Sequence, residues 1–259
     1  MEIGISAFTV KEVEAIARLG VRHSFVGSYM KDLDKVIAKM RECGITCDTL
    51  HAPFSHINDM WSEDEEKGEA ELKSQMEAID LCVKHGVPVV ITHVSSGRPM
   101  PPINEAGIAR YDALVAHARE KGVKIAFENL RYLENLALLM DRYPDMGFCW
   151  DTGHERCYTP DVRYMPLYGD RTIALHVHDN ACGMDTDDHV LPFDGKIDFE
   201  SVAADLAKYD CKCTLMLEIG RSSIMDGEAL YEEMSYGEFY GRAVASAHRL
   251  SAMVEERRK

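Results

Sequence analysis

Short apolar runs alternate along the chain with longer segments in which apolar residues recur every three or four positions. The runs Val87–Ile91 and Ile173–Leu175 are continuously apolar, which is typical of parallel strands covered on both faces. The segment Ile103–Lys121 instead repeats apolar residues at helical spacing, which indicates one buried helix face. The pattern therefore predicts strands and helices in alternation.

Eight strands are predicted, separated by helices. The strands are Glu2–Ser6, Arg22–Val26, Ile45–His51, Val87–His93, Lys124–Glu128, Gly147–Asp151, Thr172–His178 and Thr214–Glu218. The helices are Val10–Leu19, Lys31–Glu42, Asp64–His85, Ile103–Lys121, Leu133–Arg142, a short one near Asp161–Tyr168, Phe199–Lys208 and Gly227–Glu256. A strand followed by a helix is the repeating unit of a closed parallel barrel. We therefore predict an α/β fold, a (β/α)8 TIM barrel forming a single domain over residues 1–259, a usual length for this architecture.

Composition narrows the possible partners. The 44 acidic residues outnumber the 29 basic ones and give a net charge of −15, which disfavours a nucleic-acid partner and suits a small neutral or cationic substrate. No apolar run approaches the roughly 20 residues of a membrane span, and the N-terminus lacks a signal-peptide pattern. We therefore expect a cytoplasmic protein without a membrane partner. The eight cysteines include no CxxC pair, so reduced thiols are expected rather than a zinc–thiolate site.

Side chains able to bind a metal recur at one place in this pattern, the end of a strand. Nine such side chains are considered, and eight of them lie at or just past the end of an apolar run. The nine residues are His51, His93, Glu128, Asp151, His154, His176, Asp187, His189 and Glu218. The carboxyl ends of barrel strands meet at one mouth, where unpaired acids would repel one another. A divalent cation removes that conflict, and mixed oxygen and nitrogen donors suit Mn, Zn, Co or Fe, as one ion or several.

Four short motifs carry most of these residues. They are His-Ala-Pro-Phe at His51, Asp-Thr-Gly-His at Asp151, His-Val-His-Asp-Asn at His176, and the Asp-Asp-His segment that runs from Asp187 to Asp198. Together they resemble the xylose isomerase-like TIM barrel superfamily, which groups sugar phosphate isomerases and epimerases with endonuclease-IV-like apurinic endonucleases. The resemblance covers nearly the whole chain.

The resemblance implies two sets of metal ligands. Epimerase-like members hold one metal with four ligands, and the matching residues here are Glu128, Asp151, His176 and Glu218. In that group the two glutamates also act as acid and base on opposite faces of the substrate. Endonuclease-like members hold three zinc ions with a fuller set, whose additional members match His51, His93, His154, Asp187 and His189. These five residues are therefore expected to bind either further metal or substrate.

The preferred interpretation is a metal-dependent isomerase or epimerase of a sugar, polyol or keto-sugar. It would work through a metal-stabilised enediolate, with Glu128 and Glu218 exchanging the proton. An apurinic endonuclease with a multinuclear zinc site stays open, although the net charge and the short loops Ala7–Val10 and Gly27–Lys31 weigh against it. A dehydratase or lyase, which begins with the same proton abstraction, and a non-catalytic binding barrel also stay open. The segment Asn180–Gly183 lacks the arginine that the best-known ketohexose epimerases carry there.

Several neighbouring residues carry secondary expectations. Trp61 and Phe54 follow the third strand and either wall the pocket or cover the core, and Trp61 and Arg221 are candidate substrate-binding residues. His178 is expected to pack against a helix, outside the site. Asp179 or Asn180 is expected to orient a ligand histidine.

The last helix is a candidate interface between copies of the chain, since it carries several aromatic residues. The preferred interpretation is that these residues cover the barrel. The stripe comprises Tyr231, Met234, Tyr236, Phe239 and Tyr240.

Overall fold

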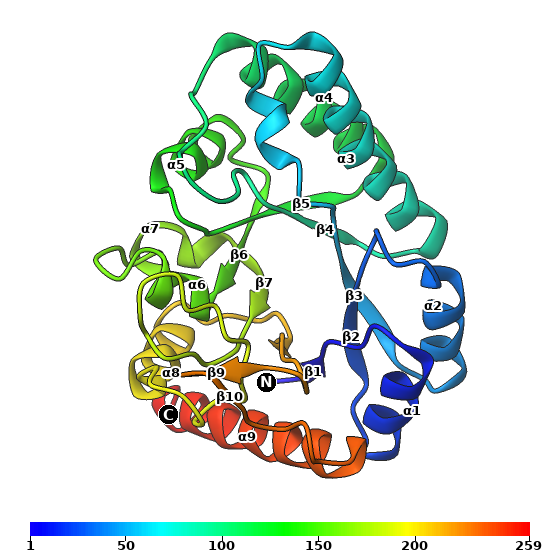
Figure 1. Cartoon of the computed structure of the whole chain (residues 1–259), viewed down its shortest axis with the longest axis vertical. Coiled ribbons are helices and arrows are strands. Elements are labelled where there is room, and N and C mark those ends of the chain that lie inside the picture. The colour runs from blue at the N-terminus through cyan, green and yellow to red at the C-terminus, as the bar shows by residue number, and fades with distance from the viewer.

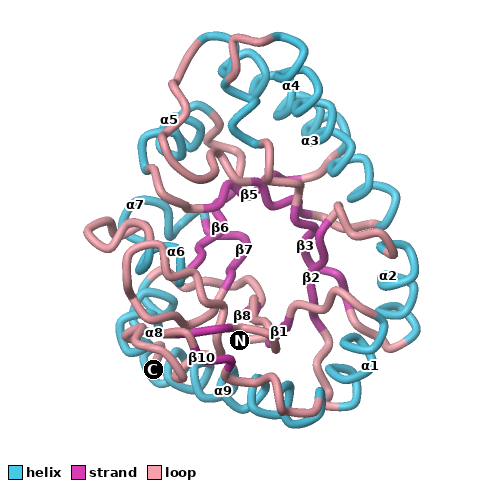
Figure 2. Tube along the Cα trace, in the orientation of Figure 1, coloured by secondary structure: helices cyan, strands magenta, loops and turns pink.

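Eight parallel strands form one sheet in the computed structural model, which describes residues 1–259. The strands are β1 (Ile3–Ile5), β2 (His23–Gly27), β3 (Thr46–His51), β4 (Val89–Thr92), β5 (Lys124–Glu128), β6 (Gly147–Asp151), β7 (Thr172–His176) and β8 (Leu215–Leu217). They pair in chain order from β1 to β7, and β8 lies beside β1. The Val177 amide donates to the Met216 carbonyl at 2.9 Å, and the Glu218 amide donates to Val177 at 3.1 Å, which closes the ring (Figure 2). The predicted barrel is confirmed.

Helices surround the strands (Figure 1). They are α1 (Val10–Arg18), α2 (Leu33–Glu42), α3 (Glu65–His85), α4 (Glu105–Lys121), α5 (Leu133–Arg142), α6 (Thr152–Cys157), α7 (Met165–Tyr168), α8 (Phe199–Lys208) and α9 (Tyr236–Arg257). Two 3-10 turns, η1 (Ile57–Trp61) and η2 (Gly169–Arg171), and a hairpin of β9 (Ile224–Met225) and β10 (Glu228–Ala229) complete the chain. No helix combines the length and the apolar character needed to cross a membrane.

The start of the last helix differs from the prediction. The predicted helix begins at Gly227, but Asp226 and Gly227 have φ angles of 51° and 84° and turn the chain between β9 and β10. That left-handed conformation cannot continue a right-handed helix. The helix begins instead at Tyr236, where Ser235 and Glu238 form a reciprocal capping box.

The aromatic stripe of this last segment packs inside the protein. Tyr231, Phe239 and Tyr240 are buried, and α9 packs against β1, β8, α1 and α8. Covering the barrel therefore accounts for these three side chains without a second copy of the chain.

The barrel interior explains where the site sits. A small apolar layer fills the barrel, formed by Ile91, Ala126, Cys149 and Ala174. Side chains two residues apart on a strand point to the same face. Two positions further along, the same strands therefore direct a second layer into the barrel mouth, formed by His93, Glu128, Asp151 and His176. Parallel register brings this polar layer together at one depth, since Asp151 lies beside His176 in the β6–β7 pair.

Candidate metal and active site

The potential ligands converge at the carboxyl ends of the strands in four groups, and within each group the ligand atoms lie within 4.8 Å of one another. One group, Glu128, Cys149 and His176, adds only Cys149 to the three described next. The central group is Glu128, Asp151, His176 and Glu218. The second is His51, His93 and Glu128, and the third is His154, His178, Asp187 and His189. All nine residues proposed from the sequence are included, and Glu128 belongs to both the first and the second group.

Glu128 is the hub of the cluster and is fully buried. Its Oε1 lies 2.9 Å from His176 Nδ1, and its Oε2 lies 3.2 Å from His51 Nε2 and 3.1 Å from His93 Nε2. Burial by itself raises the pKa of Glu128, but the imidazoles of His176, His51 and His93 outweigh it and hold that pKa well below its usual range. Glu128 is therefore present as a carboxylate.

Glu218, which directly follows β8, also approaches His176. Its Oε2 lies 3.2 Å from His176 Nδ1, and its side chain is 18% exposed, so it reaches the solvent-facing space. Burial lowers the pKa of His176, but Glu218 and Glu128 raise it to about 9. Asp151 lies beneath, and its buried Oδ2 has no hydrogen-bond partner. Such orphaned carboxylate oxygens are expected where a cation belongs.

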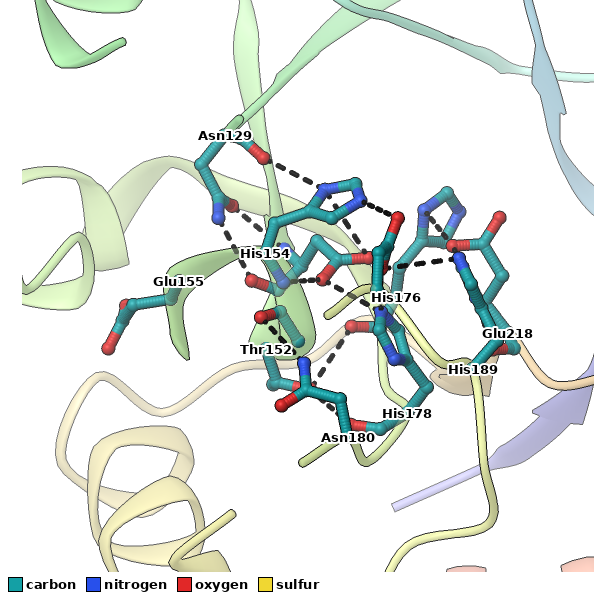
Figure 3. A network of polar contacts seen from close by, with 12 residues as sticks. Asn129, Thr152, His154, Glu155, His176, His178, Asn180, His189 and Glu218 are labelled. Atoms are coloured by element: carbon teal, nitrogen blue, oxygen red, sulfur yellow. Dashed lines mark hydrogen bonds and ion pairs between the residues drawn. The ribbon is translucent and has the colours of Figure 1, made fainter. Parts of the chain in front are cut away.

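The third group surrounds Asp187, and its histidines His154, His178 and His189 are labelled in Figure 3. Asp187 lies 3.3 Å from His154 Nε2, 3.5 Å from His178 Nε2 and 3.4 Å from His189 Nε2. Burial lowers the pKa of His189, but Asp187 and Glu218 raise it to about 10. The carboxylate of Asp187 in turn has a lowered pKa, because the imidazoles of His154 and His189 outweigh its burial.

Backbone carbonyls fix the orientation of several of these imidazoles. His51 Nδ1 donates to Ala52 at 2.7 Å, His154 Nδ1 to Asn129 at 3.0 Å, and His189 Nδ1 to Glu218 at 3.0 Å. Because Nδ1 donates to a carbonyl in each ring, Nε2 is the nitrogen that faces the carboxylates, and it can bind a metal in exchange for its proton.

A cavity of about 340 Å³ opens above the groups and is lined by members of all three. Tyr29 and Phe54 form one wall, with ring centroids 5.9 Å apart. Arg131 stacks on Tyr158 at 3.6 Å and is the one lysine or arginine of the lining. The sequence reasoning missed Tyr29, Arg131 and Tyr158, although Tyr29 and Arg131 each closely follow a strand end, which is the available signal.

A second cavity, of about 370 Å³, opens at the opposite end of the barrel, beside His23 and Asp48. It is slightly larger, but it contains no member of the three ligand groups. The cavity above Glu128 is therefore the candidate active site.

The two residues proposed to bind substrate lie outside that cavity. Trp61 is 1% exposed, its Nε1 donates to the Val94 carbonyl, and its ring packs on Tyr111. The 3-10 turn η1 directs it into the core, so the core alternative holds for Trp61 and the wall alternative for Phe54. Arg221 donates to the carbonyls of Glu232 and Met234 ahead of α9 and is thereby held away from the site.

The expectation that His178 stays outside the site is wrong. Its ring packs against Gly153 of α6, but its Nε2 lies 3.2 Å from Asp151 Oδ1 as well as near Asp187. His178 is two residues after His176, so strand alternation places both on the same face.

Asp179 has a different role from the one expected. It contacts no ligand histidine through its carboxylate, which instead accepts four backbone N–H groups at 2.8 to 3.0 Å, from Asn180, Phe193, Gly195 and Ile197. Asp179 thus fixes the segment that follows Asp187 and His189.

We expect Asp179→Ala to lower the free energy of unfolding by about 3 kcal/mol or more, since it leaves several buried donors unpaired. Urea unfolding measures the loss. Asp188→Ala is the matched control, because Asp188 accepts only the Ala181 amide and its removal should cost about 1 kcal/mol. Equal losses in the two variants would show that the four bonds to Asp179 do not anchor the segment.

Comparison with known proteins agrees with this architecture. A family model described as "Xylose isomerase-like TIM barrel" matches residues 7–236. The chain belongs to the xylose isomerase-like TIM barrel family. The resemblance noted from the motifs is thereby confirmed.

Among curated relatives, "Uncharacterized protein y4fM" of Sinorhizobium fredii is 34% identical over 196 residues, and the match covers 70% of this chain. The match covers 60% of that relative, so the chain spans about 60% of its length.

Solved structures share the xylose isomerase-like fold over almost the whole chain. A xylose isomerase domain protein from Planctomyces limnophilus is 14% identical, with a TM-score of 0.76 and 98% of both chains covered. A D-allulose 3-epimerase from Methylomonas sp. is 16% identical, with a TM-score of 0.77 and coverage of 96% of this chain and 98% of that one. An L-ribulose 3-epimerase is 15% identical, with a TM-score of 0.75 and coverage of 99% and 95%. At these identities the likeness shows the fold.

Proposed function

We propose that this chain is a metal-dependent isomerase or epimerase of a small sugar or related polyol. The main observation in support is that Glu128 and Glu218 both approach His176 Nδ1, at 2.9 and 3.2 Å, beneath a cavity of about 340 Å³. Glu128 ends β5 and Glu218 follows β8, with β6 and β7 between them in the barrel. Two carboxylates can therefore flank one small substrate. Solved structures of similar fold include an L-ribulose 3-epimerase, a D-tagatose 3-epimerase-like protein and a D-allulose 3-epimerase, which supports this substrate class.

The donor set of the central group fits a divalent cation. Three carboxylates and one imidazole are ligands that suit Mn, Zn, Co or Fe(II). The unpartnered Oδ2 of buried Asp151 supports this fit. A cation held by Glu128, Asp151, His176 and Glu218 would polarise a substrate carbonyl and offset the negative charge that develops as the neighbouring carbon loses its proton.

The remaining chemistry belongs to the side chains. One glutamate takes a proton from the substrate carbon, and the other, which has gained a proton from solvent, donates that proton to the opposite face or to the adjacent position. Glu218 borders the cavity with its side chain partly exposed, which suits a group that must reach substrate. Tyr29 and Phe54 give the cavity an aromatic wall, and the guanidinium of Arg131 offers hydrogen-bond donors to hydroxyl groups.

The test is carbon-bound hydrogen exchange during turnover. Purified protein reconstituted with Mn²⁺ or Co²⁺ is incubated in D₂O with a panel of ketoses and aldoses, and NMR follows the products. We expect at least one sugar to be interconverted with an isomer that carries deuterium at the reacting carbon. Absence of exchange and of conversion over the whole panel would overturn the proposal, and net loss of water from substrate would identify a dehydratase.

The second candidate is an endonuclease-like hydrolase of phosphate esters. The observation that favours it is the presence of two further ligand groups on either side of the central one, as a multinuclear site requires. The cavity lining weighs against it, because Glu128, Asp187 and Glu218 face a single arginine there. A duplex oligonucleotide with one abasic site, incubated with the zinc-loaded protein, distinguishes the two, since cleavage is expected only for the endonuclease.

A further inference from the structure

We propose that His178 is a metal ligand and that it completes, with His154, Asp187 and His189, a closed site of four protein ligands. The family resemblance supplies only the other three residues. The inference does not depend on the reaction performed at Glu128 and Glu218, because it concerns a separate ion with a structural role.

Backbone carbonyls orient the imidazoles of His154, His178 and His189 in the same way. His178 Nδ1 lies 3.3 Å from the Asp179 carbonyl, to which it donates, just as His154 and His189 donate from Nδ1 to Asn129 and Glu218. Each ring therefore directs Nε2 toward Asp187, as the nitrogen available to an ion. The Nε2 atom of His178 is fully buried, has no hydrogen-bond partner and faces Asp187.

The spacing of the donors suits a tetrahedral ion. The three Nε2 atoms lie 3.3, 3.5 and 3.4 Å from the carboxylate oxygens of Asp187. Zinc with bonds of about 2.0–2.1 Å places neighbouring tetrahedral ligands about 3.3–3.4 Å apart. The His154 contact is to Oδ2 and those of His178 and His189 are to Oδ1, and the four ligand atoms of this group lie within 4.8 Å of one another. Three imidazoles and one carboxylate are a zinc-like donor set.

The surrounding sequence makes room for His178 and orients Asp187. A Cβ atom at Gly153 would lie 1.9 Å from His178 Cε1, so only glycine allows the ring its position. The His178 ring stacks on His189, with centroids 4.1 Å apart. Tyr158 donates its hydroxyl to Asp187 Oδ2 at 3.0 Å, which leaves the buried Oδ1 without a partner.

Four protein ligands leave no open position for substrate or for an attacking water, as in structural rather than catalytic zinc sites. The ion would instead tie the segment carrying Asp187 and His189 to β6 and β7, at the edge of the cavity. A closed third site thus distinguishes this chain from a hydrolase in which all the ions act on substrate.

The experiment compares metal content and ligand field in the whole protein. Wild type and His178→Asn are purified from zinc-supplemented cultures, dialysed and assayed by elemental analysis, and parallel samples are loaded with Co²⁺. We expect His178→Asn to hold one metal ion fewer per chain and to lose the intense visible absorption of tetrahedral Co²⁺. His117→Asn, which replaces a histidine paired with Asp80 far from the site, should retain both.

A second pair of variants addresses the ring position independently. Gly153→Ala should lose the same ion, because the added methyl group displaces the His178 ring. Gly153→Ala/His178→Ala should recover the thermal stability that the clash removes, but not the ion. Unchanged metal content and Co²⁺ absorption in His178→Asn would overturn the proposal and leave His178 as an ion-pair partner of Asp151, 3.2 Å away. Retention of the ion in Gly153→Ala/His178→Ala would overturn it equally, whether or not His178→Asn folds.

Discussion

Glu218→Gln is expected to lower kcat on the active sugar by about 10²–10⁴-fold, which is the usual contribution of a positioned acid or base. Glutamine keeps the size of the side chain and one oxygen near His176, but it can neither accept nor return a proton at substrate carbon. Initial rates over a range of substrate concentrations measure the effect. The loss should appear in kcat more than in KM, because the missing interaction acts during proton transfer.

Two comparisons make this result interpretable. Glu218 is also a potential ligand, so metal content must be measured on the same sample, and the loss should persist at saturating Mn²⁺. Glu228→Gln, at an exposed position on β10, should leave kcat unchanged. Near wild-type turnover by Glu218→Gln would show that this carboxylate does not move the proton.

Strand positions and most of the ligand set follow from the sequence because both depend on period-two alternation. The predicted bounds of β5 and β6 match the structure, and Glu128 and Asp151 end those strands. Each lies two residues beyond a small apolar residue of the barrel interior, Ala126 and Cys149. Once a barrel is inferred, that spacing directs both carboxylates into its mouth.

The expectations that did not hold concern residues beyond regular strands. Trp61 follows β3, but a 3-10 turn directs it into the core, where its indole finds the Val94 carbonyl. Arg221 follows β8, yet carbonyls of the segment before α9 hold its guanidinium. Side-chain direction in such loops is set by tertiary hydrogen bonds, which local sequence patterns do not encode.

Removal of the metal is the prediction that bears on the site as a whole. Exhaustive treatment with a chelator should abolish turnover. After the chelator is removed, addition of Mn²⁺, Co²⁺ or Zn²⁺ should restore turnover with at least one of these ions. Stability should change in parallel, because the buried Asp151 Oδ2 and Asp187 Oδ1 have no partner within the protein. An ion at 100 times its Kd stabilises the folded state by about 2.7 kcal/mol.

For a chain of this length that stabilisation corresponds to a Tm increase of about 5–10 °C, which differential scanning calorimetry resolves. The matched control is Asp151→Asn, which removes one carboxylate of the central group and should show a smaller increase under the same treatment. Asp151 also caps α6, since its Oδ1 accepts the His154 amide, a bond that asparagine can retain. A chelated protein with unchanged Tm and full turnover would contradict the metal site, because the converging carboxylates would then be stabilised by their histidines alone.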